Sequence, residues 1–378
     1  MVWRSGLVPI VGILAGCAAS VPEAPLDRAP APPSAASVAA RPDAALPGAM
    51  LQARSRWVPV RWEELPGFDD DTLHDAWNAW LRSCEKPPAT FAPLCPQVRQ
   101  LSIADAAEQR AWMRDRLQPY RIEPLQGAAE GLLTGYYEPV VDASRRPTAD
   151  RGVPLYRPPA GLVARRPWYT RQEIDTRAEA RAQLRGREIA WIADPLDALV
   201  LQIQGSGRLR ITEPDGSMRT VRVAFAGSNE QPYRSVGGWL LQQGALRDAS
   251  WPGIKAWARD NPQRVQELLW SNPRVVFFRE EPLDDLEAGF GPRGAQGVPL
   301  TPGRSIAVDK DSIPYGTPVW LASTGPVTTL QRLVLAQDTG TAITGAVRAD
   351  YFVGWGPEAG DVAGRLKQPL RLWALWPR

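Results

Sequence analysis

Three aspartates in the C-terminal part of the chain, Asp309, Asp338 and Asp350, are the side chains best suited to chemistry. Each follows a short apolar or β-branched run and has glycines nearby, so each is expected at the end of a strand, where a ligand can approach closely. Carboxyl groups gathered in a cleft can donate and accept protons in catalysis. The alternative is that each aspartate is an ordinary turn or capping residue.

The single histidine of the chain, His74, excludes several classes of enzyme. Ser-His-Asp hydrolases, Cys-His proteases and zinc amidases with histidine ligands all require histidine in the active site. His74 lies in the amphipathic helical pattern Thr72–Leu81, where a solvated or capping histidine is expected. Catalysis in this chain must therefore depend on carboxyl groups.

A second group of residues is suited to binding a ligand that combines apolar faces with polar groups. Flat apolar faces are offered by Tyr136, Tyr137 and Trp355. Hydrogen-bonding groups are offered by Glu138, Gln204, Gly205 and Ser206. The family resemblance set out below implies that this ligand is a sugar, with ring faces and with hydroxyl and N-acetyl groups. Two alternatives stay open: Gln204–Gly207 is also a typical hairpin turn, and Glu138 could instead be the structural partner of an arginine.

The elements that must position these residues change in character along the chain. The segment 55–118 reads as helical, with Trp77, Trp80 and Leu81 at helical spacing. After Gly131, short β-branched runs alternate with glycine and proline, which predicts an all-β barrel or sandwich. The expected strands are 131–137, 198–204, 208–212, 219–225, 274–278, 305–308, 319–321, 332–337 and 370–375. A helical insert is expected over 236–246 and 251–270.

Length, charge and cysteine content narrow the class of protein further. About 325 residues follow the low-complexity N-terminal part, which suits two domains. The formal net charge is only +3, and the basic residues are interspersed with acidic ones, so no nucleic-acid partner is expected. Cys84 and Cys95 are expected to form a disulfide, and the alternative is two free buried thiols. A metal site is not expected, because two cysteines supply too few ligands.

Several motifs together resemble the membrane-bound lytic murein transglycosylase A family. Its C-terminal aspartate-rich domain runs Ala-Val-Asp, then Asp-x-Gly-x-Ala-Ile-x-Gly, then Asp, which matches the segments around Asp309, Asp338 and Asp350. Further matching motifs are Thr134–Pro139, Leu201–Gly207, Pro232–Gly237, Asn272–Arg279 and Gly356–Gly360. The resemblance covers the chain from about Gly131 to the C-terminus.

The resemblance implies a mainly β fold with packing helices, in which a discontinuous double-psi β-barrel domain and an inserted second β-barrel domain leave a groove between them. The catalytic barrel with its N-terminal helices would span residues 51–144 and 282–378. The insert would span residues 145–281.

The resemblance also implies a reaction: non-hydrolytic cleavage of the β-1,4 bond between N-acetylmuramic acid and N-acetylglucosamine in peptidoglycan. Asp350 matches the catalytic aspartate, which acts first as acid and then as base, while Asp338 would sit beside it and Asp309 would support the cleft. The C6 hydroxyl of the muramic residue would attack its own anomeric carbon, so its effective concentration replaces a second carboxylate. No cofactor and no metal are implied.

Two departures from the family pattern bear on substrate binding. Thr341 and Thr344 stand where the family commonly has Gly and Lys, so a basic side chain near the cleft is expected to be missing, and Glu230 interrupts a common Asn-Gly turn. These changes prompt one rival reading, a non-catalytic glycan-binding lipoprotein. The other rival is a hydrolytic glycosidase in which Asp350 shares the work with Asp338 or Glu138 and water is the nucleophile.

The N-terminal segment predicts export and anchoring. Arg4 precedes a short apolar stretch, and residues 1–16 are expected to be a signal peptide. Leu14–Cys17 resembles a bacterial lipobox, so Cys17 would carry the lipid; residues 17–50, rich in alanine and proline, would form a tether. Ala18 resembles the outer-membrane sorting class. The expected location is the periplasmic face of the outer membrane, as a lipid-anchored monomer acting on peptidoglycan strands, with other cell-wall enzymes as candidate partners.

Overall fold

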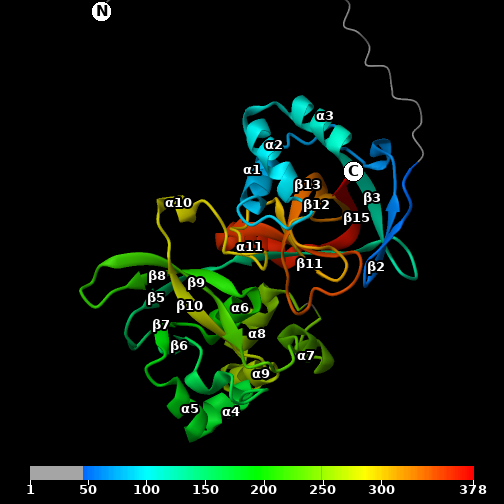
Figure 1. Cartoon of the computed structure of the whole chain (residues 1–378). Helices are drawn as coiled ribbons and strands as arrows, with labels where there is room; N and C mark the ends of the chain where they lie inside the picture. The colour runs from blue at the N-terminus through cyan, green and yellow to red at the C-terminus, as the bar shows by residue number, and fades with distance from the viewer. Residues whose placement is uncertain (1–45, 248) are drawn as a thin grey trace, which may run out of the picture. The chain divides into compact units, whose positions relative to one another are not determined.

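The structure is a computed structural model that describes residues 46–247 and 249–378 (Figure 1). In this part of the chain the strands form two sheets. The first contains β1 (Met50–Leu51), β2 (Ser55–Pro59), β3 (Leu117–Pro124), β4 (Gly131–Glu138), β11 (Ser305–Val308), β12 (Pro318–Thr324), β13 (Thr329–Asp338), β14 (Arg348–Trp355) and β15 (Lys367–Pro377). The second contains β5 (Val140–Ser144), β6 (Val153–Tyr156), β7 (Glu188–Ile192), β8 (Ser206–Thr212), β9 (Met218–Ser228) and β10 (Val276–Pro282).

Strands of the first sheet close into a barrel. Within the described residues the pairing runs β15, β12, β13, β11, β14, β4 and back to β15. The pairs β11–β13 and β14–β4 are parallel, and the other pairs of the ring are antiparallel. This closed ring confirms the expected double-psi β-barrel made of discontinuous chain. In the second sheet β6 also lies against β10, so that sheet curls toward closure.

The barrel strand β12 is apolar on both faces because both of its faces are buried. In β12, Val319 and Leu321 point into the barrel, while Trp320 and Ala322 pack under the N-terminal helices. Those helices are α1 (His74–Ser83), α2 (Cys95–Gln100) and α3 (Ala106–Arg116), and Figure 1 shows them over β12 and β13. Trp77 and Trp80 of α1 lie in this layer and His74 is exposed, as the sequence predicted.

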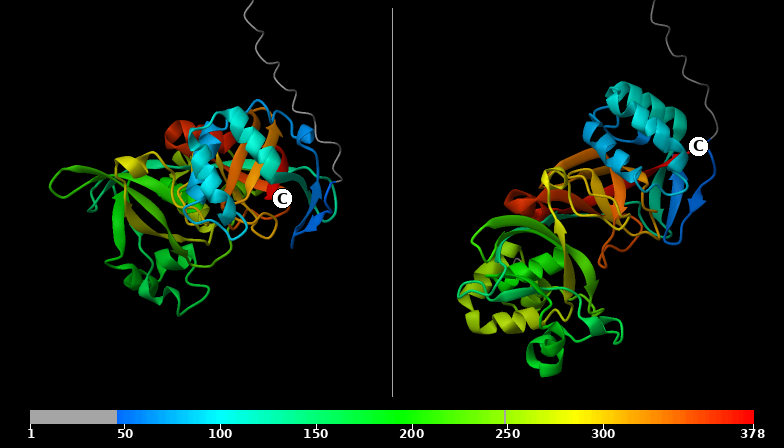
Figure 2. Two further views of the ribbon diagram at one scale, coloured as in Figure 1. Left: turned by 45° about the horizontal axis from the view of Figure 1, so that its top comes forward. Right: turned by 60° about the vertical axis from the view of Figure 1, so that its left-hand side comes forward.

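The second sheet has its own helices. They are α4 (Arg171–Thr176), α5 (Ala178–Leu184), α6 (Pro195–Gln204), α7 (Val236–Gln242), α8 (Trp251–Asp260) and α9 (Val265–Trp270), and both views of Figure 2 show them grouped around β5–β10. The remaining helices are α10 (Asp285–Ala288) and α11 (Gly356–Arg365), which packs on β4 and β14. No helix in residues 46–247 or 249–378 is long and apolar enough to cross a membrane.

Two sequence expectations about elements were wrong. The expected strand 198–204 is part of α6, which begins at Pro195 after Asp194 accepts a hydrogen bond from the Leu196 N–H; a short apolar run buried on both sides fits either element. Residues 55–59 are a strand, not helix. The strand Val140–Ser144 pairs with β8 in the second sheet, although it was assigned before the insert. The domain division itself stays a prediction.

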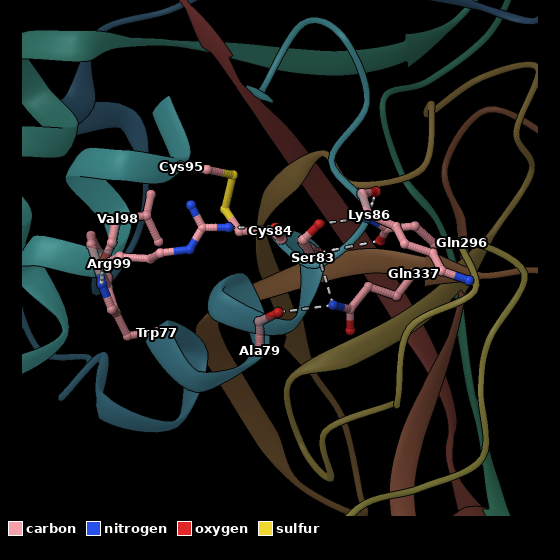
Figure 3. Close-up of a disulfide and its surroundings, with 10 residues drawn as sticks. All are labelled: Trp77, Ala79, Ser83, Cys84, Lys86, Cys95, Val98, Arg99, Gln296 and Gln337. Atoms are coloured by element: carbon pink, nitrogen blue, oxygen red, sulfur yellow. Dashed lines mark hydrogen bonds between the residues drawn. A yellow bond between two sulfur atoms is a disulfide. The ribbon is translucent and has the colours of Figure 1, made fainter. Parts of the chain in front are cut away.

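The expected disulfide is confirmed: Cys84 and Cys95 are bonded, with 11 residues of sequence separation. Closing a loop of this length stabilises the fold by about 3 kcal/mol in the chain-entropy model. Figure 3 shows what lies next to it: Ser83 accepts a hydrogen bond from Gln337 Nε2 at 2.8 Å, and the Lys86 carbonyl accepts one from Gln296 Nε2 at 3.2 Å. The cross-link therefore adjoins the end of β13, where Asp338 lies.

Candidate active site

The strand register brings Asp338 and Asp350 to one level of the barrel. Ala307 of β11 pairs with Asp338 of β13 on one side and with Asp350 of β14 on the other. Residues directly opposite one another in neighbouring strands project to the same face, and two strand spacings separate the Cα atoms by roughly 10 Å. Asp350 in turn pairs with Thr134 of β4. The register thus brings Asp338 and Asp350 to the same region of the barrel, and the roles expected of them stay predictions.

Both carboxyl groups line cavities. Asp338 lies in a cavity of about 570 Å³, and Asp350 lies in an adjoining cavity of about 210 Å³. Residues that line both cavities are Gln202, Ile203, Arg274, Val276, Gly340 and Thr341. Because these residues come from α6, β10 and the segment just before β10 on one side and from the loop after β13 on the other, the walls combine the second sheet with the barrel.

Asp350 is the head of a short hydrogen-bonded chain. The Thr134 hydroxyl donates to Asp350 Oδ1 at 2.5 Å, and Arg348 Nη2 donates to Thr134 Oγ1 at 2.8 Å. Burial raises the pKa of Asp350 above its usual range, and the Thr134 hydrogen bond and the Arg348 charge oppose that rise. The raised pKa therefore favours the protonated carboxyl group, and the Arg348 cation stabilises the carboxylate when the proton is lost.

Asp338 is held by three neighbours. The Tyr136 hydroxyl donates to Asp338 Oδ2 and the Ala295 N–H donates to Oδ1, both at 2.9 Å. Burial raises the pKa of Asp338 to about 6; backbone hydrogen bonding at Thr339, the Tyr136 hydroxyl and the Ala295 N–H counteract this, and the Asp350 charge adds to it. Burial and the Asp338 charge also raise the pKa of Tyr136, so Tyr136 keeps its proton and remains a donor.

The raised pKa of Asp338 predicts a pH-dependent stability. Because folding raises this pKa from 3.8 to about 6, the folded protein binds the proton more tightly than the unfolded chain, and stability is lost as pH rises through this window. Since Asp338 is partly exposed, the expected loss is about 1–2 kcal/mol. The free energy of unfolding is measured by urea titration between pH 4 and pH 7. As the pH rises, that of Asp338→Asn should increase by this amount relative to that of the wild type. A difference between the two proteins that stays constant with pH would contradict the assignment.

Asp309 supports a loop but lines neither cavity. Its Oδ1 accepts from the Asp311 N–H at 3.0 Å and its Oδ2 from the Gly345 N–H at 2.8 Å, and the side chain is buried. These bonds hold the chain between β13 and β14, which carries Thr341 into both cavity walls. The supporting role expected of Asp309 stays a prediction, and these hydrogen bonds are consistent with it.

The expectation that Glu138 contacts substrate is corrected by the structure. Its side chain is 0% exposed, Oε2 accepts from Arg208 Nε at 2.8 Å, and Oε1 accepts from Arg222 Nε at 2.6 Å. Glu138 is thus the structural partner of two arginines, which was the alternative interpretation. Because these ion pairs occupy Glu138, Asp338 is the remaining candidate for the second carboxylate of a hydrolytic glycosidase.

Of the three aromatic residues that were expected to bind sugar, Tyr136 lines the larger cavity. Trp355 is half-buried with the Arg208 guanidinium 3.8 Å above its ring, and Tyr137 packs against Gly360 of α11. Tyr137 and Trp355 line neither of these two cavities, and their part in sugar binding stays a prediction.

The segment Gln204–Ser206 does line the larger cavity, but as the end of a helix rather than a hairpin turn. Gly205 caps α6 in the left-handed conformation, with φ 80°, which favours glycine. Gln204 Oε1 accepts from the Tyr137 N–H at 3.1 Å. This bond ties the helix end to β4 and presents the Gly205 and Ser206 backbone to the cavity.

Sequence reasoning missed Thr134 and Arg348. Thr134 opens a motif that was noticed for its tyrosines, and Arg348 lies two residues before Asp350, so proximity in sequence was the available signal. The expected lack of a basic side chain near the cleft was also wrong. Thr344 is exposed and lines neither cavity, whereas Arg348 lines the cavity of Asp350 and supplies the positive charge.

Comparison with known proteins agrees with this architecture. A family model described as the MltA specific insert domain matches residues 132–279, and one described as the 3D domain matches residues 304–376. The chain is 31% identical over 316 residues to the membrane-bound lytic murein transglycosylase A of Vibrio cholerae, covering 80% of this chain and 75% of the relative. The corresponding Escherichia coli K12 protein is 32% identical over 272 residues, covering 68% and 69%.

Solved structures show the same likeness. The lytic transglycosylase LtgG of Burkholderia pseudomallei is 45% identical with a TM-score of 0.60, covering 85% of this chain and 95% of that one. MltA from Neisseria gonorrhoeae is 29% identical with a TM-score of 0.74, covering 88% and 96%. E. coli MltA with bound chitohexaose is 25% identical with a TM-score of 0.65, covering 80% and 89%. The chain belongs to the membrane-bound lytic murein transglycosylase A family.

Proposed function

We propose that this protein cleaves the β-1,4 bond between N-acetylmuramic acid and N-acetylglucosamine in peptidoglycan without water, leaving 1,6-anhydromuramyl ends. Family membership makes the chain an enzyme, a peptidoglycan-cleaving lytic transglycosylase. The observation that carries the finer proposal is the setting of Asp350. Among the described residues lining its cavity, Asp350 is the one carboxyl group, and it is half-buried beside Thr134 and Arg348.

The reaction needs one group that gives a proton and then takes one. Protonated Asp350 donates to the glycosidic oxygen as the bond to C1 of the muramic residue breaks, which releases the N-acetylglucosamine hydroxyl. The Asp350 carboxylate then removes the proton of the C6 hydroxyl as O6 bonds to C1, so the carboxylic acid is restored and no water is consumed. The raised pKa of Asp350 favours the first step.

The neighbours of Asp350 have matching roles in this cycle. Between the two steps Asp350 is an anion, and Arg348 stabilises it through the shared Thr134 hydroxyl. Thr134 also orients Oδ1, which leaves Oδ2 for the substrate. The substrate's own acetamido group would ease the oxocarbenium-like transition state, because no second carboxylate is placed to do so.

The hydrolytic alternative assigns the base to Asp338. Both Asp338 oxygens already accept hydrogen bonds, from Tyr136 and the Ala295 N–H, so Asp338 is better suited to shaping the cavity than to activating water.

The products of murein digestion separate these readings. Mass spectrometry of purified sacculi treated with the enzyme should show muramyl ends that are lighter by one water than reducing ends. Reducing ends would favour hydrolysis, and an absence of new ends would favour a binding protein that has lost activity. Borohydride reduction is an internal control, since it modifies reducing ends and leaves anhydro ends unchanged.

We also propose that the protein is held at the periplasmic face of the outer membrane by a lipid on Cys17. The signal peptide, Cys17 and most of the tether lie outside the described residues. Support comes from the lipobox-like Leu14–Cys17 and from Ala18. Metabolic labelling with a radioactive fatty acid should mark the wild type and not Cys17→Ser.

A further inference from the structure

The walls of the two cavities carry more positive than negative side chains. The described basic residues that line them are Lys86, Arg274, Arg279, Arg293 and Arg348, and the acidic ones are Asp338 and Asp350. Alternating N-acetylglucosamine and N-acetylmuramic acid residues are uncharged where the lactyl carboxyl group is bonded to a peptide. The glycan itself therefore offers no partner for the excess positive charge.

Two of these cations meet at one position of the wall. Arg293 Nη1 donates to the Gly297 carbonyl at 3.4 Å, and a Cβ added at Gly297 would lie 3.0 Å from Lys86 Nζ. The ammonium and guanidinium groups thus both lie over Gly297 and repel each other. Arg293 also forms a long ion pair with the half-buried Glu287, at 3.8 Å, which offsets its charge only in part. An anion bound at Gly297 would relieve this repulsion.

The position of Lys86 is built into the fold. It follows Cys84 by two residues, and its carbonyl accepts a hydrogen bond from Gln296, whose N–H in turn donates to the Gln337 carbonyl at 3.0 Å (Figure 3). The disulfide and this pair of bonds fix the backbone of Lys86 beside the strand that ends in Asp338. The cation is thereby presented at the cavity wall rather than on a free loop.

The facing wall holds a further cation, Arg274, on which the charge of Glu230 acts. Arg279 is paired with Glu281 at 2.7 Å, so its charge is offset. Arg274 donates to the Gln231 carbonyl at 3.2 Å, and no carboxylate of the described residues lies within ion-pair distance of Arg274 or of Lys86. Positive charge is thus available on both sides of the larger cavity.

We propose that Lys86, Arg293 and Arg274 form a subsite for the carboxylates of the stem peptide attached to the muramic residue. The proposal rests on the proposed function, because it takes a peptidoglycan strand as the ligand. Stem peptides carry several free carboxylates and extend from the lactyl group beside the bond that is cut. The subsite makes the enzyme prefer peptide-bearing strands over bare glycan, and it acts on binding rather than on the chemical step.

The test compares three forms of one soluble glycan strand. The first keeps its stem peptides, the second has the peptide carboxylates converted to primary amides, and the third is stripped by an amidase, which leaves the free lactyl carboxylate. Lys86→Gln/Arg293→Gln is compared with the wild type and with Lys255→Gln, which removes an exposed lysine of α8 that lines neither cavity. Equilibrium affinity by fluorescence anisotropy is measured beside KM and kcat.

On peptide-bearing strands the double variant should raise Kd and KM by about tenfold while kcat stays within about twofold, as expected for two lost charge contacts. On the amidated strands the variant and the wild type should bind alike. Each of three outcomes would overturn the proposal. They are equally weakened binding on all three strands, weakened binding on the stripped strand alone, and unchanged binding on every strand. If the wild type binds the strands but forms no anhydro ends, the proposed function fails and the affinity comparison still decides the subsite.

Discussion

Asp350→Asn should lower kcat on murein by at least about a thousandfold while the protein remains folded. General acid and general base catalysis each contribute about 10² to 10⁴ in rate, and one carboxyl group is assigned both steps here. An amide neither donates a proton to the leaving oxygen nor accepts one from the C6 hydroxyl. The release of soluble anhydro-muropeptides from sacculi measures the rate.

Folding should survive this substitution because burial disfavours the charged form of Asp350 in the wild type. The amide oxygen can still accept from the Thr134 hydroxyl. Asp142→Asn, at an exposed carboxylate of β5 that pairs with Arg210, is the matched control and should keep full activity. If Asp350→Asn retained more than a tenth of the wild-type rate, Asp350 would not be the catalytic group.

Glu138→Ala should destabilise the protein by about 3–5 kcal/mol, the range observed when one partner of a buried ion pair is removed. The substitution leaves Arg208 and Arg222, which are 7% and 2% exposed, without their carboxylate. Both arginines also donate to the Phe290 carbonyl, but a carbonyl does not neutralise two charges. The free energy of unfolding from urea titration measures the effect.

The control for this prediction is a second ion pair on the same strand, β8. Arg210 pairs with Asp142 at 2.6 Å, and both side chains are about half exposed. Asp142→Ala should therefore cost less than about 1 kcal/mol. Similar losses for the two variants would show that burial does not set the contribution of Glu138. Because Glu138 ends β4 and its partners lie in β8 and β9, Glu138→Ala should also loosen the contact between the barrel and the second sheet.

Sequence reasoning went furthest where residue type alone carries the chemistry. One histidine left the carboxyl groups as the catalytic candidates, and Asp338 and Asp350 do line adjoining cavities. The pairing of Cys84 with Cys95 was also predicted, since two cysteines in an exported chain have few other uses. These inferences required no knowledge of which strands are neighbours.

The same reasoning failed where a residue's environment decides its role. Glu138 was predicted to bind sugar as one of several hydrogen-bonding groups, but in the fold it pairs with Arg208 and Arg222, 70 and 84 residues further along the chain. The segment 198–204 was considered a strand because burial on both sides removes the periodicity that distinguishes helix from strand.

By itself the sequence determined the candidate catalytic residue types, the family motifs, the disulfide and the barrel class, because all of these are local in the chain or depend on composition. Only the tertiary structure decided that Ala307 lies between Asp338 and Asp350. It also decided that Thr134 and Arg348 lower the pKa of Asp350, and that Glu138 is the buried ion-pair partner of two arginines. The reason is physical. Strand register and burial set the distance and dielectric environment of charges, and both arise from pairings between segments far apart in the chain.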